Sequence, residues 1–181
     1  ADDLQNIDAK RYAAVVIEPI VQGVNQMRIW PAGMLRALRE WCDAHDVHLI
    51  LDEVMTGFGR TGKLFACEHE GIVPDLLCLA KGITGGYLPL AATLATEAVF
   101  QAFCGPPSEG RAFYHGHTYS GNPLGAAAAL ASLEMLLKPG YLAEVETKGK
   151  RLEAGLAVLA KHAHVGEIRR KGLMLGIELV A

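Results

Sequence analysis

Short hydrophobic runs of strand length alternate with segments of helical period along most of this chain. The runs cover residues 13–17, 47–51, 76–80 and 91–95. Between the first two runs, hydrophobic side chains recur at helical spacing, at Met34, Leu35, Leu38, Trp41 and Cys42. Such an alternation builds a mostly parallel sheet with helices on its faces. The expected fold class is therefore α/β, with a mostly parallel sheet and flanking helices.

The pattern changes near residue 138. An alanine-rich helix is predicted over 123–137, and Pro139 interrupts the chain after it. A further amphipathic helix is expected over 142–159, followed by two strands over 165–168 and 173–180. We therefore predict two domains, a large one over 1–137 and the beginning of a smaller α/β C-terminal domain over 138–181.

Composition excludes several classes of protein. The chain has 181 residues, with 17 basic and 20 acidic side chains and a formal net charge of -3. This balance argues against binding nucleic acid or a membrane surface through bulk charge, and no hydrophobic run is long enough for a membrane helix. The four cysteines form no C-x-x-C pair, which favours reduced thiols in the cytoplasm. We expect a cytoplasmic protein with neither a nucleic-acid nor a membrane partner.

One acidic and one basic residue follow two of the predicted strands. Asp52 comes directly after the run 47–51, and Lys81 comes directly after the run 76–80. In open α/β sheets the ligand site lies at the carboxyl ends of the strands. The two side chains could form a structural ion pair there, since such pairs also collect at strand ends. The other interpretation gives each residue a chemical task.

The chemical interpretation requires the two groups to lie close together. A lysine that is desolvated beneath a ligand loses affinity for its proton and becomes a nucleophile that attacks aldehydes. A nearby carboxylate holds a proton on a heterocyclic nitrogen and makes that ring an electron sink. Pyridoxal 5'-phosphate needs both groups. Lys81 and Asp52 are therefore the candidate catalytic residues.

Three segments resemble a known family in their order and spacing. They are residues 17–23 (IEPIVQG), 51–62 (LDEVMTGFGRTG) and 80–82 (AKG). Together they resemble the class III aminotransferases of pyridoxal-phosphate fold type I, and the resemblance spans nearly the whole chain. It implies part of the large domain of that fold, pyridoxal 5'-phosphate as cofactor, and a small-molecule amino donor and keto acceptor as substrates.

The resemblance also implies roles for the residues around the cofactor. Lys81 would bind the cofactor covalently and would then move a proton between substrate and cofactor carbons. Asp52 would pair with the pyridine nitrogen, and Val54, on the same side of the strand, would pack against the ring. The backbone at His117 and the hydroxyl of Thr118 would bind the phosphate. In this family that threonine reaches the site of the neighbouring subunit, which implies a homodimer.

Two further residues have implied roles near the substrate. Gly116 would lie beside the substrate. Glu18 would shape the entrance and pair with an arginine outside this chain. The chain begins without methionine and stops inside a predicted strand, so we expect a fragment of a longer polypeptide that binds cofactor weakly and turns over little by itself.

Within the family, the amino-acid sequences of three segments resemble those of one branch. These segments are residues 65–70, 77–86 and 113–123. The branch transfers an amino group to 8-amino-7-oxononanoate, giving 7,8-diaminononanoate in biotin synthesis. Met55 stands where many class III members have glutamine, and this branch also lacks that glutamine. His117 stands where some members of the branch have proline, so the amino donor stays open between S-adenosylmethionine, lysine and others.

Two alternatives remain beside this interpretation. The first keeps the cofactor and changes the substrate to that of another class III ω-aminotransferase. The second belongs to a different class, a catalytically inert piece that serves packing or dimer contact. Lys81 would then be merely buried.

Weaker signals receive structural interpretations. The histidine pairs 45/48 and 115/117 have no cysteine or carboxylate at ligand spacing, so we expect no metal site. Cys67 next to His69 does not make a catalytic geometry, and packing is the better interpretation. The basic run 169–171 is predicted to be a solvated turn.

Overall fold

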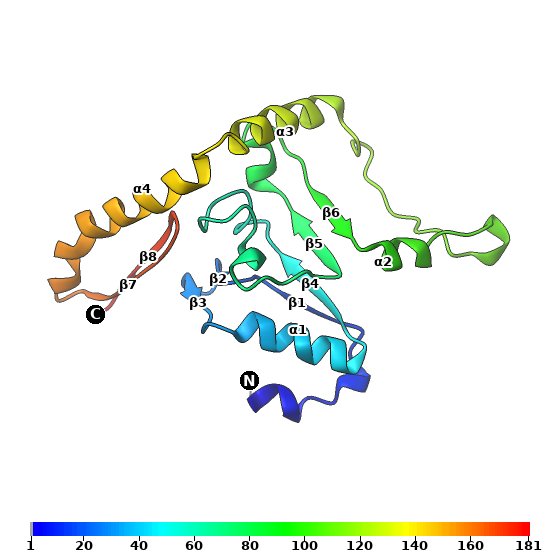
Figure 1. Ribbon diagram of the computed structural model, residues 1–181, viewed down its shortest axis with the longest axis horizontal. Helices are drawn as coiled ribbons and strands as arrows, with labels where there is room; N and C mark the ends of the chain where they lie inside the picture. Colours follow the sequence, from blue (N-terminus) through cyan, green and yellow to red (C-terminus); the bar gives the residue numbers. More distant parts are fainter. Residues whose placement is uncertain (1) are drawn as a thin grey trace.

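A four-stranded sheet forms the centre of the computed structural model, which describes residues 2–181 (Figure 1). Its strand order is β1-β4-β5-β6, namely Ala14–Ile17, His48–Asp52, Leu76–Leu79 and Ala92–Ala95. The pairs β1–β4 and β4–β5 are parallel, and β6 runs antiparallel to β5. The predicted α/β class with a mostly parallel sheet is therefore confirmed.

Helix α1 (Met34–His45) packs against the sheet, and its buried face forms the main hydrophobic core together with β4, β5 and the segments that flank them. The helical positions that the sequence predicts to be hydrophobic face inward, at Leu35, Leu38, Trp41 and Cys42. They meet strand β4, in which Leu49 and Leu51 are 0% exposed. Burial of apolar side chains in this layer is the main force that holds β4 in the middle of the sheet.

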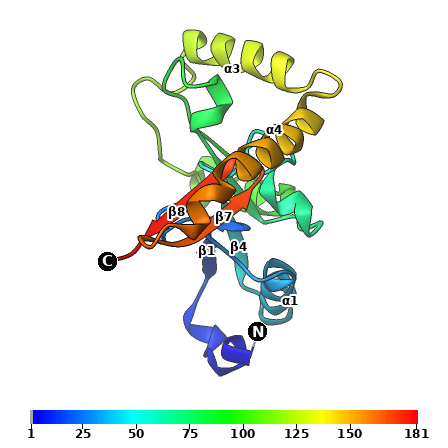
Figure 2. The ribbon, with the colours of Figure 1, turned by 90° about the vertical axis from the view of Figure 1, so that its left-hand side faces the viewer.

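The remaining elements surround this centre (Figure 2). The other strands are β2 (Val21–Gln22), β3 (Arg28–Ile29), β7 (Val165–Lys171) and β8 (Met174–Leu179). The other α-helices are α2 (Glu97–Ala102), α3 (Pro123–Leu136) and α4 (Tyr141–Leu156). Short 3-10 helices are η1 (Asp2–Asn6), η2 (Ala9–Arg11), η3 (Ala66–His69), η4 (Lys81–Thr84), η5 (Pro107–Glu109) and η6 (Ala157–Lys161). The sequence did not reveal β2 and β3, because two residues are too few to show an alternating pattern.

The prediction of a solvated turn at 169–171 is wrong. These residues belong to β7, and the turn falls one residue later at Gly172, whose φ is 60°. Arg169 is only 9% exposed and forms ion pairs with Glu167 and Glu178. Paired carboxylates compensate for the cost of removing an arginine from water, so a charged run can lie in a partly buried strand.

The helical conformation is interrupted between α3 and α4, where Gly140 adopts a φ of 84° before α4 begins. From α4 the chain enters the β7–β8 hairpin, which lies under α4 in Figure 1. Met174 of this hairpin is buried in one cluster with Ile20, Val21 and Ala66. The hairpin therefore packs against the first part of the chain, and the division into domains 1–137 and 138–181 stays a prediction.

A buried carboxylate, that of Glu53, joins the segment that follows β4 to η3. Glu53 is 0% exposed and accepts hydrogen bonds from the Thr56 hydroxyl (3.0 Å), the Ala66 amide (2.6 Å) and the Cys67 amide (2.8 Å). Burial raises the pKa of the Glu53 carboxyl, although the hydrogen bonds oppose this effect. A Cβ atom on Gly57 would lie 2.8 Å from the Glu53 carbonyl oxygen. The glycine loop, residues 56–62, is thereby fastened to η3.

We expect Glu53→Ala to lower the free energy of unfolding by about 3 kcal/mol or more, because three buried donors lose their acceptor. Chemical denaturation of the complete protein measures the loss. The matched control is Glu68→Ala. Glu68 also accepts a backbone amide, that of Phe65 at 3.1 Å, but it is exposed and water can replace it. Its loss should stay below about 1 kcal/mol, and equal losses for the two variants would contradict the role of Glu53.

Candidate active site

Parallel pairing of β4 with β5 brings two ionisable residues to one edge of the sheet. Asp52 is the last residue of β4 and is in register with Cys78 of β5. Lys81 begins η4, two residues after the end of β5 at Leu79. Both residues therefore lie at carboxyl ends of neighbouring parallel strands, where ligands bind in open α/β folds.

The backbone at Lys81 has an unusual conformation. Its φ is 43°, in the left-handed region that residues with a side chain rarely adopt. The next residue is Gly82, where a Cβ atom would come within 2.9 Å of the Phe58 Cβ. The chain thus turns sharply away from β5 at Lys81 while Phe58 packs closely against the turn. Strained backbone of this kind collects at functional sites.

Lys81 lines two cavities. The first has a volume of about 1000 Å³ and lies between η4 and α3; we call it the α3 cavity, and its walls include Phe58, Arg60, Lys81, Tyr87, Ser132 and Tyr141. The second has a volume of about 840 Å³; we call it the arm cavity, and its walls include Lys81, Leu90, His117, Tyr119, Ser120 and Asn122. The Lys81 side chain is exposed, because both cavities open to solvent, and its desolvation beneath a ligand stays a prediction.

Asp52 is partly buried, and its carboxylate is oriented by the chain itself. The Val54 amide donates a hydrogen bond to the Asp52 Oδ1 at 3.0 Å. Among the ion pairs of residues 2–181, none joins Asp52 to Lys81. The structure therefore gives no support to a plain ion pair between the two residues.

Val54 does not lie on a strand. β4 ends at Asp52, so the expectation that Val54 follows on the same side of the strand is wrong. The chain turns after Asp52 because the Glu53 carboxylate is fastened to η3. Val54 is partly buried beside Asp52, and its packing against a cofactor ring stays a prediction.

Glu18 supports a local turn. Its Oε2 accepts the Gly23 amide at 2.8 Å, and its carbonyl oxygen accepts the Trp30 indole N–H at 3.0 Å. A Cβ atom on Gly23 would lie 2.9 Å from the same carboxylate oxygen. Glu18 thus organises the β2–β3 hairpin, a structural role that the sequence did not reveal. Its pairing with an arginine outside this chain stays a prediction.

Gly116, His117 and Thr118 lie in the long exposed connection between α2 and α3. The His117 amide donates to the Ser120 Oγ at 3.0 Å, and the His117 Nδ1 accepts the Tyr119 amide at 3.1 Å. His117 shares the arm cavity with Lys81, whereas Gly116 and Thr118 line neither cavity. Within this chain the structure therefore brings His117 to Lys81 but leaves Gly116 and Thr118 apart.

Contacts from α3 complete the surroundings of Lys81, and the sequence did not reveal them. The Ser132 hydroxyl of α3 donates to the Gly82 carbonyl oxygen at 3.4 Å, and the Thr84 hydroxyl donates to the Leu88 carbonyl oxygen at 2.6 Å. Ser132 is 50 residues from Gly82 in sequence. No local pattern could have linked the two.

Cys67 and His69, which are close in sequence, have structural roles. Cys67 is buried, and burial together with the neighbouring Glu53 charge raises the pKa of its thiol to about 12. The His69 Nε2 is hydrogen-bonded to Thr61. Cys67 and His69 therefore do not form a pair of nucleophile and base. Within residues 2–181 no group of three or more metal-binding side chains is present. In the same described range, no helix is long and apolar enough to cross a membrane.

Known proteins match this chain along its whole length. The family model for class-III aminotransferases matches residues 1–181. A curated relative, the adenosylmethionine-8-amino-7-oxononanoate aminotransferase of Nitratidesulfovibrio vulgaris, is 56% identical over 168 residues, which is 93% of this chain and 31% of the relative. This chain thus spans about a third of the length of that relative.

Solved structures match the fold equally well. The adenosylmethionine-8-amino-7-oxononanoate aminotransferase of Methanocaldococcus jannaschii has a TM-score of 0.91 and 45% identity, covering 95% of this chain and 40% of that one. An amine transaminase from an uncultivated Pseudomonas species, solved in its PLP-bound form, has a TM-score of 0.90 and 40% identity, covering 99% of this chain and 40% of that one. With the family model matching all 181 residues, the chain belongs to the class III aminotransferases.

Proposed function

We propose that the complete protein is a pyridoxal-phosphate-dependent enzyme that transfers an amino group to 8-amino-7-oxononanoate, giving 7,8-diaminononanoate in biotin synthesis. The observation that carries the proposal is the position of Lys81 and Asp52 at neighbouring carboxyl ends of β4 and β5. The name of the Nitratidesulfovibrio vulgaris relative, at 56% identity, supports the choice of substrate. The chain spans only part of that relative, so the activity belongs to the whole protein.

The residues at the sheet edge fit the cofactor. An amine on a turn lines cavities large enough for a small ligand, and a carboxylate with one oxygen already held by Val54 lies on the next strand. When bound, pyridoxal phosphate supplies an aldehyde that condenses with amines and a ring that withdraws electrons. Lys81 would hold its aldehyde end, and an Asp52 carboxylate oxygen would accept a hydrogen bond from the protonated pyridine nitrogen.

The side chains of this chain then have distinct tasks. Lys81 is exposed in its cavities. Once the amino donor has displaced it from the cofactor, its free amine would take a proton from a substrate carbon and return it to a cofactor carbon. The hydrogen bond from Val54 keeps the Asp52 carboxylate in one orientation. His117 and Thr118 would bind the phosphate, and Gly116 and Glu18 would contact or enclose the substrate.

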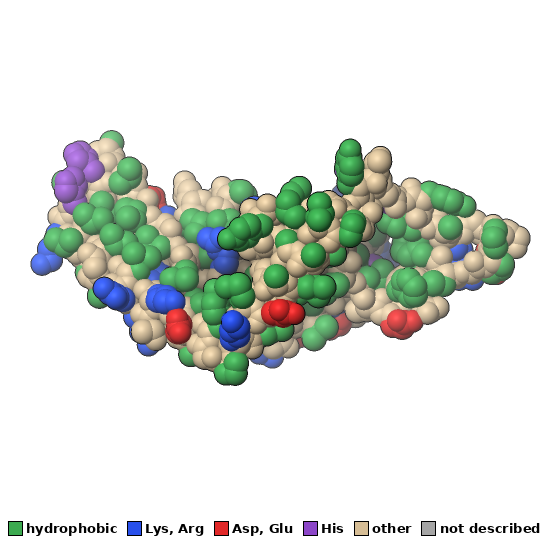
Figure 3. Space-filling model, turned by 90° about the horizontal axis from the view of Figure 1, so that it is seen from above, with side chains coloured by type: hydrophobic (Ala, Val, Ile, Leu, Met, Phe, Trp, Pro, Cys, Tyr) green, Lys and Arg blue, Asp and Glu red, His purple; other side chains and the backbone are tan. Residues whose placement is uncertain are grey.

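We further propose a homodimer in the cytoplasm, with Thr118 reaching the site of the partner subunit. Every residue from 105 to 121 is exposed, and so are large hydrophobic side chains on α3, including Leu124 (69%), Leu130 (64%) and Met135 (60%). Seen from above in Figure 3, hydrophobic side chains are spread over this face. A partner subunit would cover such a surface.

Replacing Lys81 tests the chemistry. We expect Lys81→Ala to abolish covalent attachment of pyridoxal phosphate, because Lys81 is the lysine among the residues that line the two cavities. After borohydride reduction of the loaded protein, mass spectrometry should find the cofactor on the peptide that contains Lys81 and nowhere else. As a control, Lys63→Ala removes an exposed lysine just after the glycine loop, and this variant should bind cofactor normally.

Two outcomes of that experiment would contradict the proposal. One is a reduced cofactor adduct on another lysine of the parent protein. The other is amino transfer that persists at the parent rate in Lys81→Ala, which would also favour the inert role of this part of the chain.

A second candidate keeps the cofactor and changes the substrate, as in another class III ω-aminotransferase. The amine transaminase from the Pseudomonas species supports it, because its TM-score of 0.90 is close to the 0.91 of the Methanocaldococcus jannaschii enzyme. The shared fold therefore does not choose between the substrates.

A direct competition separates the two candidates. We expect the complete protein to convert 8-amino-7-oxononanoate to 7,8-diaminononanoate, detected by mass spectrometry, at a kcat/KM at least 10-fold above that for simple aldehydes or 2-oxo acids. S-adenosylmethionine and lysine are supplied separately as donors, with Lys81→Ala as the blank. A preference for the simple acceptors would establish the second candidate instead.

A further inference from the structure

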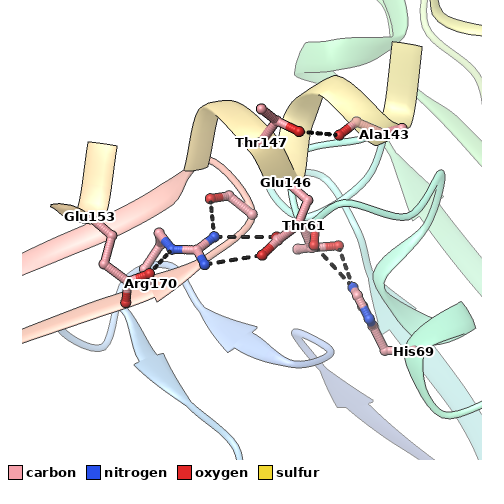
Figure 4. Close-up of polar contacts among 8 residues, drawn as sticks. Thr61, His69, Ala143, Glu146, Thr147, Glu153 and Arg170 are labelled. Carbon is pink, nitrogen blue, oxygen red and sulfur yellow. Dashed lines mark hydrogen bonds and ion pairs between the residues drawn. The ribbon is translucent and has the colours of Figure 1, made fainter. Parts of the chain in front are cut away.

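Arg170 of β7 joins three parts of the C-terminal region (Figure 4). Its Nε donates to the Glu153 Oε2 at 2.9 Å and its Nη2 donates to the Glu146 Oε1 at 3.2 Å, so both carboxylates of α4 hold it. Its Nη1 donates to the Gly172 carbonyl oxygen at 3.0 Å. The side chain is only 11% exposed. These contacts fix the guanidinium in one orientation, with one edge holding the β7–β8 turn.

The β7–β8 turn in turn contacts the glycine loop. The Leu173 amide donates to the Arg60 carbonyl oxygen at 2.9 Å. A Cβ atom on Gly172 would lie 2.4 Å from the same oxygen and 2.5 Å from the Thr61 carbonyl carbon. Only glycine permits so close an approach, and its φ of 60° is also one that glycine favours. The turn is therefore seated directly on the backbone of the loop.

The opposite side of the loop is held by η3. The His69 Nε2 lies 3.1 Å from both the carbonyl oxygen and the hydroxyl of Thr61, which is 1% exposed. Figure 4 shows Arg170 and His69 on opposite sides of this part of the loop. The backbone at Arg60 and Thr61 thus has a fixed support on one side and the turn on the other.

The loop also reaches the candidate site. Phe58 and Arg60 line the α3 cavity together with Lys81. Phe58 packs against Gly82, next to Lys81 in the chain. A displacement of the loop backbone would therefore move one wall of the cavity that Lys81 faces.

We propose that Arg170 is a positioning residue for the reaction at Lys81: by holding the Gly172 carbonyl it presses the β7–β8 turn onto the Arg60 backbone, and so sets the cavity wall formed by Phe58 and Arg60. The inference rests on the proposed function for its catalytic consequence only. The mechanical part, that Arg170 immobilises the glycine loop, stands on the contacts alone.

The neighbouring Arg169 provides a matched control. It lies on the same strand, is similarly buried, and is also held by two carboxylates, those of Glu167 and Glu178. It makes no contact with the β7–β8 turn among the hydrogen bonds of the described residues. Arg169→Met and Arg170→Met each remove one charge and two ion pairs. The pairs of Arg169 lie within the β7–β8 hairpin, whereas those of Arg170 join β7 to α4, and only the second variant also releases Gly172.

Hydrogen exchange measures the mechanical part without any turnover. In the complete protein we expect Arg170→Met to speed amide exchange at least 10-fold in peptides that cover residues 57–64 and at Leu173, whose amide is bonded to Arg60. Arg169→Met should leave these peptides unchanged. Arg170→Lys, which keeps one donor for the Gly172 carbonyl, should restore part of the protection.

Kinetics measure the catalytic part. Because a small misplacement of groups around a reacting centre can cost up to roughly 100-fold in rate, we expect Arg170→Met to lower kcat/KM by about 10- to 100-fold and Arg169→Met by less than about 2-fold. Covalent cofactor attachment at Lys81 should persist in both variants. Thermal unfolding midpoints are recorded for each, so that a loss of stability common to both variants is recognised.

Three results would overturn the inference. Unchanged exchange of the loop in Arg170→Met would show that the arginine does not hold it. Faster exchange with unchanged kcat/KM would show that the loop does not set the site. Equal kinetic losses for the two variants would assign the effect to general destabilisation. If the parent protein transfers no amino group, the proposed function fails, and the exchange comparison still decides whether Arg170 holds the loop.

Discussion

The parallel pairing of β4 with β5 is the constraint on which the rest of the site depends. Two strands that run the same way end at the same edge, so Asp52 and Lys81, which are far apart in sequence, both come to that edge. The pairing is secured by the hydrophobic layer between β4 and α1, where Leu49 and Leu51 are completely buried. Core packing thus positions Asp52 and Lys81 at the edge of the sheet.

Beyond the sheet edge, positions are set by polar contacts in places with little water. Glu53 holds the chain after Asp52, and Arg170 holds the turn that rests on the glycine loop. Each is a titratable side chain that is largely removed from solvent and surrounded by hydrogen-bond partners. Such contacts are directional, so they fix orientation in a way that hydrophobic packing alone does not.

Much of the fold could be predicted from the sequence. The strands of the main sheet are short hydrophobic runs, and helix α1 repeats a helical period over several residues. The site residues could be proposed because Asp52 and Lys81 directly follow the hydrophobic runs 47–51 and 76–80. What escaped prediction depends on contacts that are distant in sequence: Ser132 with Gly82, or Leu173 with Arg60. The basic run at 169–171 misled for the same reason, because its acidic partners on α4 and β8 are not visible locally.

The left-handed backbone of Lys81 has a consequence for how this position can change. A residue with a side chain held at a φ of 43° costs on the order of 1 kcal/mol relative to glycine. Glycine here would relieve that cost and would at the same time delete the amine. At residue 81 the backbone conformation and the proposed chemistry therefore favour different residues, glycine for the first and lysine for the second.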